Sequence, residues 1–117
     1  MSLKIEAEKR GHWGERRAAW WLRLHGWRIL ARRVKIKVGE IDLIAKRGQV
    51  VAFVEVKTRN TPVELDYSID AWRLRRVANA VRAVAHLYAK NGEDIRIDAI
   101  LVAPRAWPRH LVNVWDG

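Results

Sequence analysis

Apolar residues recur at steps of three and four over residues 4–25, a spacing that predicts an amphipathic helix. Gly26 follows directly and is suited to end the helix, because glycine readily adopts the left-handed conformation found there. One acid, Glu15, falls on the apolar face of this helix. The apolar members of that face are Ala18, Ala19 and Leu22. We therefore expect Glu15 to point toward whatever the helix packs on.

A second helix is predicted over residues 68–90, after a polar, proline-containing loop at residues 60–67. Its apolar stripe consists of Leu74, Val77, Val81, Val84 and Tyr88. Shorter apolar runs predict strands. These strands cover residues 27–34, two runs of a hairpin within residues 39–59, residues 95–103 and residues 111–115. A helix between the third and fourth strands makes those two strands parallel, so the fold class is α/β, with a mixed central sheet flanked by helices.

The hairpin brings two acids and a lysine together. A turn at residues 46–49, in which Gly48 can adopt a positive φ, joins its two strands. In an antiparallel pair, the numbers of directly opposed residues have a constant sum, and a turn of even length makes that sum odd. The numbers of Asp42 and Glu55 also have an odd sum, so the two acids are expected on the same face, diagonal or opposite. Lys57 shares the face of Glu55, because side chains two residues apart point the same way. The residues expected on the opposite face are Ile41, Leu43, Val54 and Val56.

Two carboxylates this close repel each other, and a divalent cation would remove the conflict. Mg²⁺ or Mn²⁺ needs few protein ligands, so Asp42, Glu55 and the backbone carbonyl of Val56 are sufficient. An ion held there can activate a water for phosphodiester hydrolysis. We expect Lys57 to stabilise the charge that develops in the transition state. Glu15, brought in by the first helix, could bind the same ion or orient a water.

The charge of the chain points to a polyanionic partner. Its 117 residues include 23 Lys and Arg but only 13 Asp and Glu, a formal net charge of +10. Ten of the basic residues, and a single acid, lie within residues 9–37. Such clustering is typical of nucleic-acid-binding proteins, although basic residues can also serve solubility alone. The residues expected to contact nucleic acid are Arg16, Arg17, Arg32, Arg33, Lys35, Lys37, Arg59, Arg73 and Arg75.

Length, hydropathy and cysteine content narrow the class of protein. A chain of this length, with 50% hydrophobic and 31% charged residues, is expected to form one globular domain over residues 1–117. No apolar run is long enough to span a bilayer, so no membrane partner is expected. The sequence contains no cysteine, which excludes disulfides and thiolate metal sites and favours the cytoplasm.

Asp42, Glu55 and Lys57 form a D…E-x-K pattern that resembles the PD-(D/E)xK nuclease superfamily, whose restriction-endonuclease-like core has the same element order. Nearly the whole chain is also similar to the YraN-like family of endonuclease-like bacterial proteins. That similarity is carried by residues 14–15, 39–44 (GEIDLI), 53–59 (FVEVKTR) and 96–98 (RID). A more distant similarity joins the chain to archaeal Holliday junction resolvases, which also place a Glu on the first helix. The resemblance implies an endonuclease-like protein.

The sequence departs from the YraN-like pattern at the start of the second helix. Family members often carry a lysine there, whereas residues 70–76 of this chain read DAWRLRR. Arg73 or Arg75 could take over a phosphate contact. Neither can act as a deprotonable base, because the guanidinium group stays charged.

Several of these interpretations have a structural alternative. The hairpin acids and Lys57 could form a solvated face with cross-strand ion pairs, and Glu15 could pair with Arg16 or Arg23. Four tryptophans near the basic segment could stack on unpaired bases or pack in the core: Trp13, Trp20, Trp21 and Trp27.

Two further acids have roles that the sequence leaves open. Glu40 alternates onto the face of Asp42, but a strand-end salt bridge with Lys37 or Arg59 explains it equally well. Asp98 is expected to be structural, paired with Arg96 or with a group near the site.

The function favoured by the sequence is metal-dependent hydrolysis of DNA phosphodiester bonds by an endonuclease acting on branched or single-stranded DNA. RNA stays open as an alternative substrate, and cutting of branched DNA would favour a homodimer. The first rival is a catalytically silent nucleic-acid-binding module of the same fold. The second is an interaction protein whose basic surface meets an acidic protein partner.

Overall fold

The computed structural model describes residues 3–60 and 71–115 and contains the expected order of elements. The helices are α1 (Leu3–Leu24) and α2 (Ala71–Tyr88). The strands are β1 (Arg28–Ile36), β2 (Gly39–Arg47), β3 (Val50–Thr58), β4 (Asp94–Val102) and β5 (Arg109–Leu111). All but the first residue of the predicted loop at 60–67, and the predicted helix start at 68–70, lie outside the described residues.

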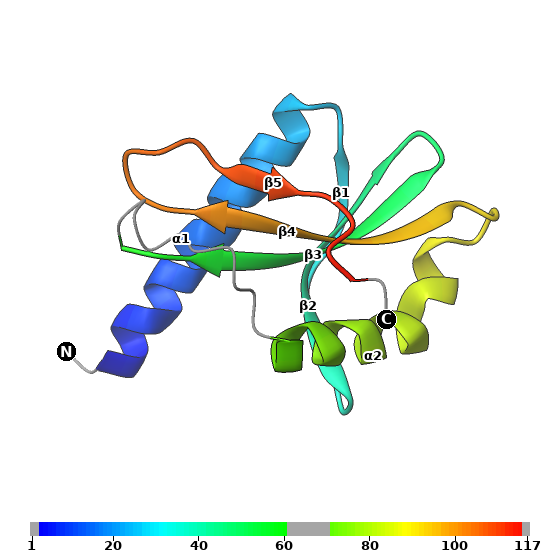
Figure 1. Ribbon diagram of the computed structural model, residues 1–117, viewed down its shortest axis with the longest axis horizontal. Coiled ribbons are helices and arrows are strands. Elements are labelled where there is room, and N and C mark those ends of the chain that lie inside the picture. The colour runs from blue at the N-terminus through cyan, green and yellow to red at the C-terminus, as the bar shows by residue number, and fades with distance from the viewer. Residues whose placement is uncertain (1–2, 61–70, 116–117) are drawn as a thin grey trace.

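The five strands form one mixed sheet in the order β1-β2-β3-β4-β5. β3 and β4 run parallel, as the intervening α2 requires, and the other neighbours are antiparallel. Figure 1 shows α1 behind the sheet and α2 in front of it. The predicted α/β class and the parallel pair are therefore confirmed. Within the described residues, neither helix combines the length and the apolar character needed to cross a bilayer.

The final strand is shorter than predicted and begins earlier, at Arg109–Leu111 rather than at residues 111–115. Asn113 has a φ of 55°, a left-handed conformation that an extended strand cannot continue through. Its N–H donates to Oδ1 of Asp98 at 2.9 Å instead of to a neighbouring strand. The chain beyond Leu111 is thus held to β4 by the Asp98 side chain and by the Val114 N–H, which donates to the Ile97 carbonyl at 2.8 Å.

Each helix buries its apolar stripe against one face of the sheet. α1 packs on one face through Ala18, Ala19 and Leu22. α2 packs on the other through Leu74, Val77, Ala78, Ala80, Val81 and Val84. Two glycines allow close approach, because a Cβ at Gly14 would overlap the Thr58 side chain and a Cβ at Gly39 would overlap the Arg76 carbonyl. Gly14 directly precedes Glu15 on α1, and Gly39 lies three residues before Asp42 on β2. Each contact therefore holds a helix close to one of the acids.

Candidate active site

The two hairpin acids face each other across β2 and β3. The turn consists of Gly48 and Gln49, within the predicted segment, and Gly48 has the expected positive φ, 59°. Opposed residues from Arg47 and Val50 onward have numbers that sum to 97. Continued one step beyond its last pair, this register puts Asp42 and Glu55 on the same face, as the parity of the loop predicted.

The pairing of the hairpin changes at Asp42. Regular pairing ends at Leu43 and Val54, and the Asp42 carboxylate accepts the N–H of Val56 at 2.8 Å. A side chain thereby satisfies a backbone donor that the neighbouring strand no longer reaches. Ile41 packs with the α2 side of the core, whereas Leu43, Val54 and Val56 pack with the α1 side. The prediction that Ile41 shares their face is therefore wrong, because the strands separate at Asp42.

α1 presents Glu15 to the same region, as its position on the apolar face predicted. Glu15 is 8% exposed and pairs with Arg33, whose Nε lies 3.0 Å from Oε2, and not with Arg16 or Arg23. Arg33 has a φ of 50° and lies between two β1 residues that pair with the neighbours of Asp42. The ion pair between Glu15 and Arg33 depends on an irregular backbone position in β1. Hydrophobic periodicity in the sequence therefore could not predict it.

Arg73 of α2 covers Glu55. Its Nε donates to Oε1 of Glu55 at 2.8 Å, and its guanidinium also lies 4.0 Å from the Glu40 carboxylate. Glu55 is 3% exposed, and its Oε2 atom is buried without a hydrogen-bond partner among the described residues. One oxygen of Glu55 is therefore paired with α2, and the carboxyl group also lies within hydrogen-bonding reach of the Asp42 side chain.

Two hollows meet at Arg73. The larger, of about 230 Å³, is lined by Asp42, Glu15 and the basic residues Arg33 and Lys35, among others. The smaller, of about 210 Å³, includes Glu55 in its wall. Arg73 lines both hollows, so its side chain lies between the hollow of Asp42 and that of Glu55.

Lys57 lies two residues beyond Glu55 on β3 and is half-buried. Strand alternation puts both side chains on one face, as predicted, but Lys57 lines neither of the two hollows. Val56, which lies between them, does line the larger hollow. The structure thus collects Asp42, Glu55 and Glu15 around one region, with Lys57 at its margin.

The pKa values of the three acids are all raised. Burial raises the pKa of Glu55 to about 8, and the neighbouring Asp42 carboxylate adds to this against the opposing charge of Arg73. Burial also raises the pKa of Asp42, although the Val56 N–H and Arg73 oppose it. Burial and then the Asp42 charge raise the pKa of Glu15, with Arg33 opposing. Such clustered negative charge is typical of sites that bind a cation.

The donor set suits a hard cation with few protein ligands. Among the described residues, no three His, Cys, Asp or Glu side chains form a cluster that could hold a metal ion. Mg²⁺ needs only one or two carboxylates, because it keeps most of its waters. Asp42, the unpartnered Oε2 of Glu55 and the Val56 carbonyl provide oxygen donors of that kind.

The predicted nucleic-acid contacts fall into two groups. Arg33, Lys35 and Arg73 border the larger hollow, where two of them pair with acids. Arg59 is half-buried and donates to the Thr58 carbonyl at 2.8 Å. The rest belong to α1, β1 and α2 or their ends: Arg16, Arg17, Arg32, Lys37 and Arg75.

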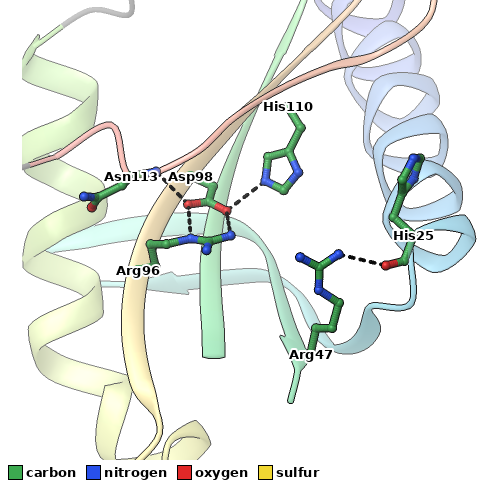
Figure 2. Close-up of polar contacts among 6 residues, drawn as sticks. All are labelled: His25, Arg47, Arg96, Asp98, His110 and Asn113. Atoms are coloured by element: carbon green, nitrogen blue, oxygen red, sulfur yellow. Dashed lines mark hydrogen bonds and ion pairs between the residues drawn. The ribbon is translucent and has the colours of Figure 1, made fainter. Parts of the chain in front are cut away.

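Asp98 forms a separate polar cluster at β4 (Figure 2). It is fully buried and accepts two hydrogen bonds of 2.9 Å from Arg96, confirming the predicted pair. His110 of β5 lies 2.8 Å away and adds a partner that the sequence did not identify. Burial opposes ionisation, but these hydrogen bonds lower the pKa of Asp98. The cluster joins β4 to β5 and the segment after it.

The four tryptophans named from the sequence have different environments. Trp27 is 4% exposed, lies in the core and has Arg47 stacked on its ring at 4.6 Å, so it cannot serve as a base-stacking platform. Trp13 is partly packed against the same core. Trp20 is 45% exposed and Trp21 is half-buried.

Comparison with known sequences identifies close relatives. Residues 14–102 match the family described as "Uncharacterised protein family UPF0102". A UPF0102 protein from Erythrobacter litoralis is 63% identical over 110 residues, covering 94% of this chain and 95% of the relative. One from Sphingopyxis alaskensis is 59% identical over 113 residues, covering 97% of each chain. The match confirms the family resemblance expected from the sequence motifs.

A solved structure has the same fold. It is that of Archaeoglobus fulgidus Hjc, a Holliday junction resolvase from an archaeal hyperthermophile. The superposition has a TM-score of 0.60 at 20% sequence identity and covers 84% of this chain and 72% of Hjc. At this identity the comparison establishes the shared architecture, and the expected resemblance to archaeal resolvases is confirmed at the level of fold.

Proposed function

The chain belongs to the UPF0102 family, and on that premise we propose that it is a divalent-metal-dependent endonuclease that hydrolyses phosphodiester bonds of DNA. The observation that carries the proposal is the Oε2 atom of Glu55, which is buried, unpartnered and part of a carboxylate pair with Asp42. Two buried acids of raised pKa are unfavourable in a purely structural role.

Asp42, Glu55 and the Val56 carbonyl would hold Mg²⁺ or Mn²⁺, which when bound supplies a Lewis acid and an activated water. Glu15, on the wall of the hollow that Asp42 and Val56 also line, would orient a water or add a ligand. Lys57, at the margin, would stabilise negative charge that develops on the phosphate. Arg33 and Lys35 border the hollow and would hold the neighbouring phosphates.

The substrate we propose is DNA, with branched or single-stranded forms favoured. The net charge of +10 supports a nucleic-acid partner. The fold shared with a Holliday junction resolvase supports a branched substrate. A two-fold symmetric dimer would suit such a substrate. A chain without cysteine also suits the reducing cytoplasm.

One observation favours the rival, a silent binding module of the same fold. Arg73 occupies Oε1 of Glu55 and lies between the two acids' hollows, so a guanidinium already neutralises part of the negative charge. If this pairing persists with DNA bound, the chain would bind nucleic acid without cutting it.

The deciding experiment combines cleavage with metal binding. Linear, single-stranded, flapped and four-way DNA are incubated with the protein in Mn²⁺ or in chelator, and Mn²⁺ binding is measured by calorimetry. We expect Mn²⁺-dependent cleavage that is lost in Asp42→Asn, Glu55→Gln and Lys57→Met, with metal binding lost only in the two acid variants. Asp94→Asn, an exposed acid at the start of β4, is the matched control. DNA binding without cleavage or metal binding by the parent would establish the silent module.

A further inference from the structure

α1 carries a second stripe on the side opposite to Glu15. Its members recur at steps of three and four, like those of the buried stripe, but point about half a turn away from them. They are Trp13, Arg16, Arg17, Trp20 and Trp21. Tryptophan and arginine thus share the helix face opposite the buried stripe, where only Trp13 among the three tryptophans is partly packed against the α1 side of the core.

The connection between β4 and β5 lies beside α1 (Figure 1), and its residues share a hollow with Arg17. Trp107 of that connection lies 5.9 Å from Trp21, measured between ring centroids. Trp21 is itself held against His25, whose ring centroid is 4.3 Å away and whose Nδ1 lies 2.7 Å from the Trp21 carbonyl. Trp107 is nevertheless 70% exposed. An indole supported from behind presents a fixed, solvent-facing aromatic surface at low entropic cost.

Two hollows adjoin along this surface and share Arg17. One, of about 190 Å³, lies among Trp13, Arg16, Arg17 and Trp20. The other, of about 290 Å³, lies between Arg17 and the β4–β5 connection, with Arg105 and Trp107 in its wall. The six residues Trp13, Arg16, Arg17, Trp20, Arg105 and Trp107 are called the tryptophan–arginine surface below.

The charge of this surface indicates which class of ligand it can bind. None of the described residues lining the two hollows is acidic. Arg17 lies over the Trp13 ring at 5.2 Å, and its Nε is buried without a hydrogen-bond partner among the described residues. A second copy of the chain would place arginines against arginines. A flexible chain of flat rings and phosphates would satisfy both the indoles and the guanidinium groups.

We propose that the tryptophan–arginine surface binds single-stranded nucleic acid, with unpaired bases stacked on Trp20 and Trp107 and the backbone phosphates on Arg16, Arg17 and Arg105. The proposal takes its polymer class from the proposed function but requires no catalysis. One turn of α1 then serves two purposes, because Glu15 faces the larger site hollow while Trp13 and Arg16 border this surface. A substrate with an unpaired arm beside a duplex would engage both.

The test is fluorescence anisotropy of a labelled 15-nucleotide oligo-dT and of a labelled duplex, both in chelator. We expect Trp20→Ala and Trp107→Ala each to weaken oligo-dT binding by about 5- to 160-fold, the range for one stacked base. Duplex binding should change by less than about twofold. Trp107→Phe is the matched control and should retain most of the affinity, because it keeps an aromatic face. Both side chains are substantially exposed, so the folded chain should tolerate these changes.

The outcomes separate this inference from the nuclease proposal. If the parent cuts DNA but both alanine variants bind oligo-dT as the parent does, the surface assignment is wrong and the nuclease stands. If the parent neither binds metal nor cuts DNA, and the two alanine variants bind oligo-dT more weakly than the parent, the surface assignment is supported and the nuclease proposal is wrong. A shift of Trp107→Ala from dimer to monomer in sedimentation, with oligo-dT binding intact, would reassign the surface to contacts between copies.

Discussion

Arg73 on α2 donates its Nε to Oε1 of Glu55 at 2.8 Å and thereby holds a carboxylate that the proposed metal would need. The guanidinium lies between the hollows of Asp42 and Glu55, so it acts on both acids electrostatically. Arg73 therefore opposes the metal's charge, and it would be well placed to meet a phosphate once the metal binds.

Arg73→Gln should separate these two effects. Removing a positive charge beside the carboxylate pair should tighten Mn²⁺ binding about tenfold, roughly 1.4 kcal/mol. Cleavage should nevertheless fall, because a phosphate contact is lost. Calorimetry reports the first quantity and single-turnover cleavage the second. Arg82→Gln, an exposed arginine further along α2 that lines neither hollow, is the control. Unchanged Mn²⁺ affinity in Arg73→Gln would show that the ion pair does not oppose the metal.

The stability of the metal-free chain should fall as the pH rises. An unfolded Glu releases its proton near its ordinary pKa of 4.5, whereas folded Glu55 keeps it until about pH 8. Between these values the native state binds more protons than the unfolded state, so the free energy of unfolding decreases with pH. The decrease attributable to Glu55 should be on the order of 3 kcal/mol between pH 5 and pH 8.

Urea unfolding in chelator at several pH values checks this expectation. Glu55→Gln removes the titrating group while keeping the shape of the side chain, so the difference between the two proteins isolates its contribution. If the free energy of unfolding changed with pH in the same way in the parent and in the variant, Glu55 would be ionised over the whole pH range. Asp42 and Glu15 also have raised pKa values and contribute in the same direction in both proteins.

Asp98→Ala should destabilise the fold without touching the hairpin site. Asp98 is fully buried and pairs with Arg96 and His110, which would lose their shared acceptor. Removing one partner of a buried ion cluster costs about 3–5 kcal/mol, because the remaining charge is left uncompensated. Urea unfolding at pH 7 measures the loss, and Asp94→Asn on the same strand serves as an exposed control. A loss below about 1 kcal/mol would mean that β5 is held chiefly by its sheet pairing.

The hairpin shows what sequence reasoning could reach and where it stopped. The sum of the residue numbers correctly placed Asp42 and Glu55 on the same face, because that sum stays odd for any even-length turn. The same regularity failed for Ile41, since the Asp42 carboxylate replaces backbone pairing at Val56 and the strands separate there. Periodicity describes regular elements and carries no information on the point where a side chain interrupts one.

The partners of the buried acids were likewise beyond the sequence. The helical spacing placed Glu15 on the buried face, and its 8% exposure agrees with that. Its partner proved to be Arg33, which is distant in sequence and has a left-handed backbone. His110 joined Asp98 only because β5 pairs beside β4. Ion pairs of this kind depend on tertiary register, which local patterns do not encode.

Gly39→Ala should move α2 away from the hairpin. A Cβ at Gly39 would overlap the backbone carbonyl of Arg76, which cannot rotate away as a side chain could. The helix must therefore shift, and Arg73, one turn earlier, shifts with it. We expect a loss of about 1–3 kcal/mol in urea unfolding, the range typical of overpacking. Weakening of the Arg73–Glu55 pair should accompany it, visible as tighter Mn²⁺ binding, as in Arg73→Gln.

Gly11→Ala provides the matched control for that substitution. A Cβ at Gly11 would meet no atom within 4 Å, and the residue lies inside α1, where alanine is preferred to glycine. This variant should gain about 0.5–1 kcal/mol of stability. If Gly39→Ala were equally stabilising, the close approach of β2 to α2 would not exist in solution, and the position assigned to Arg73 over Glu55 would lose its support.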